Sequence, residues 1–113
     1  MKYRKYNNTK IEVDGFKFDS KKESKRYQEL KILKKAGIIK DFKMQVPYLL
    51  IPSQKDTITK KTLERPVKYL ADFVVIGFDN TEIVEDTKGM RTALYILKRK
   101  LMLYVHGIRI KEI

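Results

Sequence analysis

Residues 69–76 read Tyr-Leu-Ala-Asp-Phe-Val-Val-Ile, and the stretch that decides the fold continues at residues 83–89 with Ile-Val-Glu-Asp-Thr-Lys-Gly. The first segment is apolar on both faces except for Asp72, which is typical of a central strand. A carboxylate in such a strand loses much hydration energy unless it is paired, metal-bound or neutralised. The second segment predicts a neighbouring strand, joined to the first by a turn at residues 79–81.

Side-chain alternation decides which acids of these two strands meet. It places Asp86 and Lys88 on one face of the second strand, and Glu85 and Thr87 on the other. Two carboxylates about 4 Å apart repel by about 4 kcal/mol at an effective dielectric constant of about 20, so a pair of Asp72 and Asp86 requires a cation. Directly opposed residues of an antiparallel pair share a face, and Asp72 can oppose Asp86 only if the loop has an odd number of residues or a bulge restores the parity. We therefore predict a departure from a plain two-residue turn at residues 79–80, with Glu85 directed away from Asp72.

The chain before these strands predicts a hairpin and a helix. Residues 1–9 are basic and aperiodic, so we expect a flexible basic arm over 1–9 and one folded domain over 10–113. Alternation around Asp14-Gly15 predicts a β-hairpin. Residues 20–36 have helical periodicity, and the helix ends at Gly37.

Glu23 is an unexpected acid on this helix, because it shares a stripe with Tyr27 and Leu30 and so faces the core. Ser20 and Glu23 also fit a capping box, in which Ser20 caps the Glu23 amide and Glu23 accepts from the Ser20 N–H. Helix capping and a role in a metal site therefore both stay open.

The remaining segments favour an α/β or α+β layered domain. Residues 42–46 alternate as a half-buried strand, and Pro47 and Pro52 place the next residues at an edge or bend. Residues 53–66 are polar and predict a long loop or a loosely paired excursion. Residues 92–106 predict a second helix closing at Gly107, and residues 108–113 a last strand.

The amino-acid composition indicates the kind of partner and excludes several kinds of site. Lys and Arg number 26 against 14 Asp and Glu, a formal net charge of +12, which favours a polyanionic partner. There is no Cys, which excludes disulfides and thiolate zinc sites, and the one histidine, His106, suits a helix-end role. No secretory signal or membrane span is found, so we expect no membrane partner and a cytoplasmic protein.

Metal chemistry on this chain must therefore use carboxylates. Glu23, Asp72 and Asp86, with Lys88 nearby, suit a hard cation with oxygen ligands, Mg²⁺ or Mn²⁺. On a basic domain the matching chemistry is phosphodiester hydrolysis. Lys88 would orient and deprotonate the water or steady the developing charge, and both roles stay open.

This constellation, an acid on the first helix (Glu23), an acid on a central strand (Asp72) and acid-x-Lys on the next strand (Asp86-Thr87-Lys88), resembles the PD-(D/E)XK nuclease superfamily. The resemblance implies a restriction-endonuclease-like αβββαβ core over residues 20–113, with a mixed central sheet flanked by helices and the N-terminal hairpin outside it. It further implies that the acids and the Thr87 backbone carbonyl bind Mg²⁺ and that Lys88 is catalytic. Ala71 stands where the superfamily often has Pro, and Asp86 where Glu is more frequent.

Residues 18–23, 71–73 and 85–89 are similar to a family of small phage-encoded proteins of this superfamily, over nearly the full length. Gln45-Val46-Pro47 looks like the Gln-x-Pro element of phage junction resolvases and transposon-end-cleaving nucleases. The resemblance implies a DNA endonuclease of phage or prophage origin, acting in a bacterial host on branched or Holliday-junction DNA. A homodimer would let one protein cut both strands of a junction.

The predicted nucleic-acid contacts are basic side chains of the arm and the two helices, together with Gln45; they are Lys2, Arg4, Lys5, Lys22, Arg26, Gln45, Arg91 and Lys98. Two alternatives to a DNA endonuclease stay open. One is a non-catalytic nucleic-acid-binding module in which Asp72 and Lys88 form a buried ion pair and Glu23 caps its helix. The other is a nuclease directed at RNA.

Overall fold

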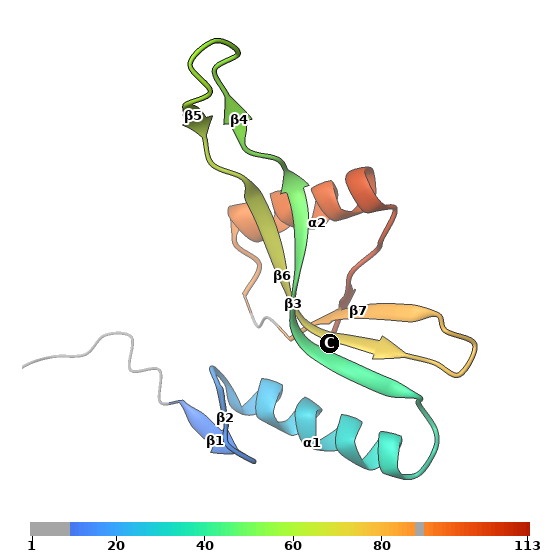
Figure 1. Ribbon diagram of the computed structural model, residues 1–113. Coiled ribbons are helices and arrows are strands. Elements are labelled where there is room, and N and C mark those ends of the chain that lie inside the picture. Colours follow the sequence, from blue (N-terminus) through green and yellow to red (C-terminus); the bar gives the residue numbers. More distant parts are fainter. Residues whose placement is uncertain (1–9, 88–89) are drawn as a thin grey trace, which may run out of the picture.

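The computed structural model describes residues 10–87 and 90–113 of the chain (Figure 1). The predicted arm over residues 1–9 and Lys88 lie outside this part. The elements, in chain order, are β1 (Ile11–Val13), β2 (Phe16–Phe18), α1 (Lys21–Lys35), β3 (Asp41–Ile51), β4 (Gln54–Lys55), β5 (Thr62–Glu64), β6 (Val67–Ile76), β7 (Glu82–Asp86), α2 (Ala93–His106) and β8 (Lys111–Glu112).

The central sheet has the strand order β3-β6-β7-β8. Strands β3, β6 and β7 are antiparallel neighbours, and β8 returns parallel to β7 after α2. With the small β4–β5 pair set aside, the elements from α1 onward follow the order αβββαβ. The predicted mixed α+β fold and the N-terminal β1–β2 hairpin are confirmed.

Both helices begin and end at the predicted signals. Ser20 Oγ accepts from the Glu23 N–H at 3.1 Å, and Thr92 Oγ1 accepts from the Tyr95 N–H at 3.1 Å, so each hydroxyl satisfies an amide that the helix leaves unpaired. Gly107 closes α2 with φ 68°, a left-handed conformation that suits glycine. Neither helix of the described residues is long and apolar enough to cross a membrane.

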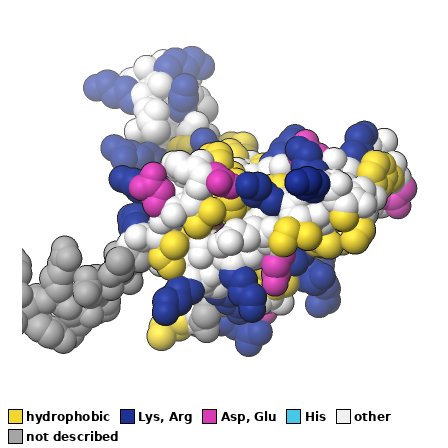
Figure 2. Space-filling view, turned by 90° about the horizontal axis from the view of Figure 1, so that it is seen from below, with side chains coloured by type: hydrophobic (Ala, Val, Ile, Leu, Met, Phe, Trp, Pro, Cys, Tyr) yellow, Lys and Arg dark blue, Asp and Glu magenta, His cyan; other side chains and the backbone are white. Residues whose placement is uncertain are grey.

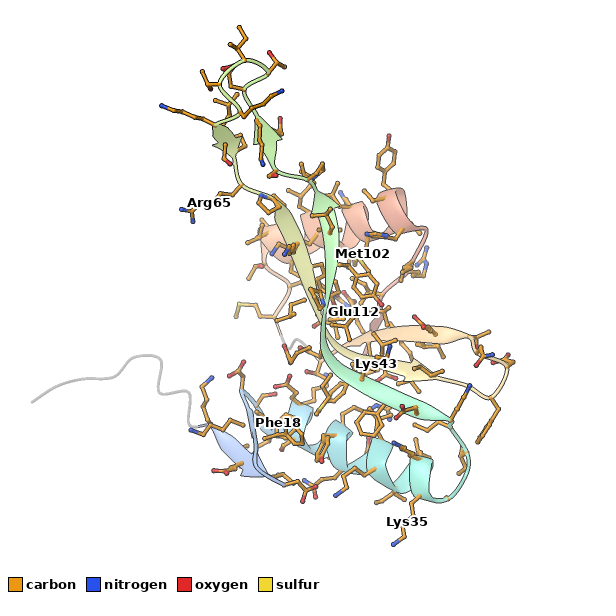
Figure 3. All side chains as sticks on the ribbon, viewed as in Figure 1. Phe18, Lys35, Lys43, Arg65, Met102 and Glu112 are labelled. Carbon is orange, nitrogen blue, oxygen red and sulfur yellow. The ribbon has the colours of Figure 1, made fainter. Side chains whose placement is uncertain are left out.

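The two helices pack against successive halves of the β3–β6 ladder, as Figure 1 shows. Phe73 and Val75 pack with Tyr27 and Leu30 of α1, together with Phe18 of the hairpin. Farther along the ladder, a larger cluster includes Tyr69, Ala71, Tyr95 and Met102. Figure 3 shows Phe18 beside α1 and Met102 on α2 near the sheet. Val74 also belongs to this larger cluster, so beyond residue 72 neighbouring β6 side chains pack into different clusters.

The β6–β7 register confirms the predicted loop parity. Phe73 pairs with Glu85 and Ile76 with Glu82, so the connection over residues 77–81 has an odd number of residues. Gly77 donates to the Thr81 carbonyl at 3.0 Å, and Asn80 adopts φ 67°, which Asn tolerates better than most residues. The register ends at the Phe73–Glu85 pair, one residue short of Asp72 and Asp86.

Residues 52–66, which we call the ribbon, leave the sheet between β3 and β6. The sequence left a loop and a loosely paired excursion as alternatives here, and the structure has the second. Gln54 pairs with Glu64 and Lys55 with Thr62, so β4 and β5 form a separate two-stranded sheet. The ribbon projects from the body of the molecule (Figure 1).

Candidate active site

A pocket of about 410 Å³ lies where the hairpin, α1 and the β3–β6 ladder meet. It brings together Glu23 of α1, Gln45 of β3 and Asp72 of β6, which are distant in sequence. The other lining residues are Lys10, Phe16, Lys17, Phe18, Asp19, Met44 and Phe73. The hairpin, expected to lie outside the catalytic core, therefore forms a wall of this pocket.

Glu23 is held in the first turn of α1 with 5% of its surface exposed, as its helical stripe predicted. Its Oε1 accepts from the Asp19 N–H at 3.0 Å, and its Oε2 accepts from Gln45 Nε2 at 3.0 Å. The sequence had predicted the Ser20 N–H as the capping partner; the contact is instead one residue earlier. Because its Oε2 contacts Gln45 of β3, Glu23 links α1 to the sheet in addition to capping the helix.

Asp72 lies at the centre of β6 and is oriented by Thr87. Its Oδ2 accepts from both the backbone N–H and the Oγ1 hydroxyl of Thr87, each at 2.8 Å. The sequence predicted only a role for the Thr87 carbonyl. The two donors, from the residue just after β7, fix the direction of the Asp72 carboxylate.

The carboxyl groups of Glu23 and Asp72 interact directly across the pocket. Burial raises the pKa of Glu23, the Asp19 N–H opposes this, and the neighbouring Asp72 carboxyl raises the pKa further. Within the described residues neither acid forms an ion pair with Lys or Arg. Two facing carboxylates without a cation favour a shared proton or a bound metal ion.

Gln45 has an unusual backbone, with φ 53° inside a strand. Its neighbours pair regularly, Met44 with Phe73 and Val46 with Ala71, so Gln45 stands opposite Asp72. A non-glycine residue in this region costs roughly 1–3 kcal/mol, and such strain clusters at functional sites. Here the left-handed conformation accompanies the amide contact to Glu23.

Asp86 is fully buried at the end of β7, on the α2 side of Asp72. Its Oδ2 accepts from the Tyr69 hydroxyl at 2.6 Å, and burial together with Asp86 raises the pKa of Tyr69. The described lining of the pocket does not include Asp86. In residues 10–87 and 90–113, no three acidic or histidine side chains form a group that could hold a metal ion.

Glu85, predicted to point away from Asp72, has a structural partner on α1, the helix that also carries Glu23. It is 1% exposed and accepts from Arg26 Nε at 2.8 Å and Arg26 Nη2 at 2.7 Å. Arg26 also contacts Glu29 at 3.3 Å. The guanidinium that the sequence predicted to bind nucleic acid is thus engaged within the fold.

The other predicted nucleic-acid contacts are differently placed. Lys22 is exposed on α1, and Lys98 is half-buried on α2 beside Tyr95. Arg91 is bound by Glu112, through Nε at 3.0 Å and Nη2 at 2.7 Å. Lys2, Arg4 and Lys5 lie outside the described residues. Figure 2 shows Lys and Arg side chains spread over the face seen from below.

Sequence reasoning missed three parts of the site: the Tyr69 hydroxyl, the Thr87 donors and the hairpin wall. Tyr69 packs in the larger cluster and also donates its hydroxyl to Asp86. A tyrosine facing the same core as a buried acid is a signal that could have identified the Tyr69–Asp86 contact. His106 contacts the Leu49 carbonyl of β3 at 2.6 Å instead of the carbonyls of its own helix end.

The protein is thus a mixed α+β protein with a pocket in which the carboxyl groups of Glu23 and Asp72 face each other. The family described as protein of unknown function (DUF1064) matches residues 3–111, and the chain belongs to this family. No curated protein and no solved structure matches the chain.

Proposed function

We propose that the protein is a metal-dependent endonuclease that hydrolyses DNA phosphodiesters with Mg²⁺ or Mn²⁺. The observation that carries the proposal is the Glu23–Asp72 pair, two carboxylates from separate elements that meet in an open pocket. Such a pair is electrostatically unfavourable by itself and suits a site that receives a cation.

The donor chemistry fits a hard cation. Mg²⁺ in proteins is held by one or two carboxylates, with water and substrate phosphate completing its shell, so Glu23 and Asp72 suffice as a minimal set. In the proposal Asp86 and the Thr87 carbonyl add to it from the end of β7. When bound, the cation would polarise the phosphate and neutralise charge on the leaving oxygen.

The protein's own residues position these acids. Gln45 and the Asp19 N–H orient Glu23, and Thr87 orients Asp72. Lys10 and Lys17 line the pocket and would attract the phosphate, while Lys88 is proposed to orient the water or to steady the developing charge. The chain thus supplies an acidic centre with lysines around it.

DNA is the proposed substrate because the net charge of +12 favours phosphate contacts. Branched or Holliday-junction DNA, an origin in a phage or prophage, action in a bacterial cytoplasm and a homodimer are parts of the proposal that rest on the resemblance to phage nucleases. The acidic pocket supports hydrolysis, and the resemblance supports the form of the substrate.

The test incubates purified protein with linear, flapped and four-way DNA in Mg²⁺, Mn²⁺ or EDTA at low salt. We expect cleavage with a metal and none with EDTA. Asp86→Asn keeps an oxygen that accepts from Tyr69, so this variant should fold and bind DNA yet lose cleavage. Glu29→Gln, which changes an exposed acid of α1, is the matched control and should cleave normally.

Cleavage of no substrate with either metal would overturn the proposal. DNA binding without cleavage would favour the non-catalytic module, and cleavage of RNA but not DNA would favour the RNA-directed alternative. An Asp86→Asn protein that cleaves like the wild type would remove Asp86 from the site.

A further inference from the structure

The ribbon, residues 52–66, is a second feature whose chemistry suits nucleic acid. It carries four basic side chains against two acids, Lys55, Lys60, Lys61 and Arg65 against Asp56 and Glu64. The seven residues from Pro52 to Ile58 extend at most about 23 Å at about 3.3 Å per residue. Figure 3 shows Arg65 directed away from the body at the base of the ribbon.

The tip of the ribbon is built around Asp56. The Asp56 N–H donates to the Lys61 carbonyl at 2.8 Å, and the Lys60 N–H donates to the Asp56 carbonyl at 2.9 Å. The Asp56 carboxylate accepts from the Ile58 N–H at 3.3 Å and from Thr59 Oγ1 at 3.2 Å. One of the two acids of the ribbon is therefore used to shape its tip.

This turn holds Ile58 out in solvent, 86% exposed, with Lys60 and Lys61 directly after it. A lone exposed apolar residue is ordinary on a protein surface. Here, however, the apolar side chain is at the end of a projecting, internally bonded and basic ribbon. Ile58 is thus at the tip, while the other exposed apolar side chain of the ribbon, Leu63, lies back in β5.

We propose that the ribbon enters a groove of duplex DNA, where its lysines contact phosphates and Ile58 inserts as a wedge at a base step. A two-stranded ribbon can enter the minor groove of B-form DNA, whereas the minor groove of A-form RNA is wide and shallow. Apolar side chains that enter the minor groove unstack a base step and kink the duplex. The ribbon therefore binds and bends the DNA.

The ribbon shares only its DNA partner with the proposed nuclease and does not need the metal site. Its test can therefore be made in EDTA with the full chain. A duplex of about 30 base pairs carries a donor dye and an acceptor dye at its ends, so that energy transfer reports bending and anisotropy reports binding. Binding is measured over a series of salt concentrations.

Two variants address the two parts of the proposal, and each has a matched control. Ile58→Ala removes the wedge, and Ile32→Ala removes a similarly exposed isoleucine, 67% exposed, from α1. Lys61→Gln removes a charge from the ribbon, and Lys35→Gln removes one from the far end of α1 (Figure 3). All four side chains are exposed, so all four proteins should fold.

We expect Ile58→Ala to lose at least half of the energy-transfer change with a smaller loss of affinity. Lys61→Gln should lower the slope of log affinity against log salt by about 1. The controls should behave as the wild type. Wild-type bending in Ile58→Ala, or a wild-type salt slope in Lys61→Gln, would overturn the proposal, as would equal competition by duplex RNA.

The outcome is separate from that of the nuclease test. Bending in EDTA without any cleavage in Mg²⁺ would support the ribbon and overturn the nuclease. Cleavage in Mg²⁺ with no effect of the ribbon variants on bending or on the salt slope would support the nuclease and overturn the ribbon proposal.

Discussion

The acids of the pocket and the acids of the surrounding framework differ in their partners. Glu85 is bound by the Arg26 guanidinium, and Glu112 by Arg91 and Arg99. Glu23 and Asp72 instead accept from neutral amides and a hydroxyl, and they face each other. Glu85 and Glu112 are neutralised within the fold, and Asp19 of the pocket pairs with Lys10. Glu23 and Asp72, in contrast, are oriented by neutral donors and form no ion pair within the described residues. The partner of a buried acid therefore distinguishes a structural role from a role toward a ligand.

The pKa values follow the same division. The Tyr95 hydroxyl, then Arg91, lower the pKa of Glu112 to about 2. Burial raises the pKa of Glu23, and the Asp72 carboxyl adds to the rise. One glutamate is thus stabilised as an anion and the other is destabilised as one. Substitutions in the two groups of acids can test this contrast, beginning with the largest expected effect.

The largest expected effect is on cleavage by Asp72→Asn. Asparagine keeps an oxygen that accepts from Thr87, so the fold should be retained, but the charge proposed to hold the cation is lost. We expect single-turnover cleavage to fall at least about 1,000-fold, roughly 4 kcal/mol in activation free energy. Thermal unfolding in EDTA should change little, and a large loss of stability would indicate that Asp72 is a framework acid.

Arg26→Met should have the largest effect on stability. Removing one partner of a buried ion pair costs about 3–5 kcal/mol, and the partial exposure of Arg26 places the expected loss near the lower end. Urea denaturation measures it. The double variant Arg26→Met, Glu85→Met should regain most of the loss, because no charge is then stranded. An unchanged single variant would contradict the framework role of Glu85.

The two glutamates should give opposite pH dependences in metal-free protein. The pKa of Glu112 is depressed, so its stabilisation is present above the usual value of 4.5 and is lost as pH falls toward about 2. The pKa of Glu23 is raised, so its contribution is present below 4.5 and is lost as pH rises through the raised pKa. Denaturation at a series of pH values should show that Glu112→Gln flattens the first trend and Glu23→Gln the second. If the two variants showed the same dependence of stability on pH, the proposed difference between Glu112 and Glu23 would be wrong.

The smallest effects are expected at the two helix caps. Ser20→Ala and Thr92→Ala should each lower the free energy of unfolding by about 1 kcal/mol. Only Ser20→Ala should also slow cleavage by a few fold, because Ser20 fixes the turn that carries Glu23. Equal cleavage by the two variants would show that the pocket tolerates a frayed α1.

Features encoded by short stretches of sequence were predictable. Helical periodicity, the Ser20 cap and the closing Gly37 and Gly107 predicted both helices, and alternation predicted the strands. Parity alone predicted the odd β6–β7 connection. These predictions succeeded because each depends on residues close together in the chain.

The contacts that complete the site depend on residues far apart, and they were not predictable. Arg26 and Glu85 are 59 positions apart, and nothing near either residue indicates the other. The hairpin wall of the pocket follows from packing of Phe18 against α1, which is tertiary. The φ of Gln45 has no local signal either, since a left-handed conformation normally suggests glycine or asparagine.

The odd-numbered connection between β6 and β7 also limits which insertions and deletions the chain tolerates there. If the far ends of both strands stay fixed, adding or deleting one residue in the connection moves every β7 side chain to the opposite face, so Glu85 would leave Arg26 and Asp86 would leave Tyr69. Changes of two residues keep the faces. Functional relatives should therefore differ in this connection by even numbers of residues, unless a compensating bulge lies elsewhere in the hairpin.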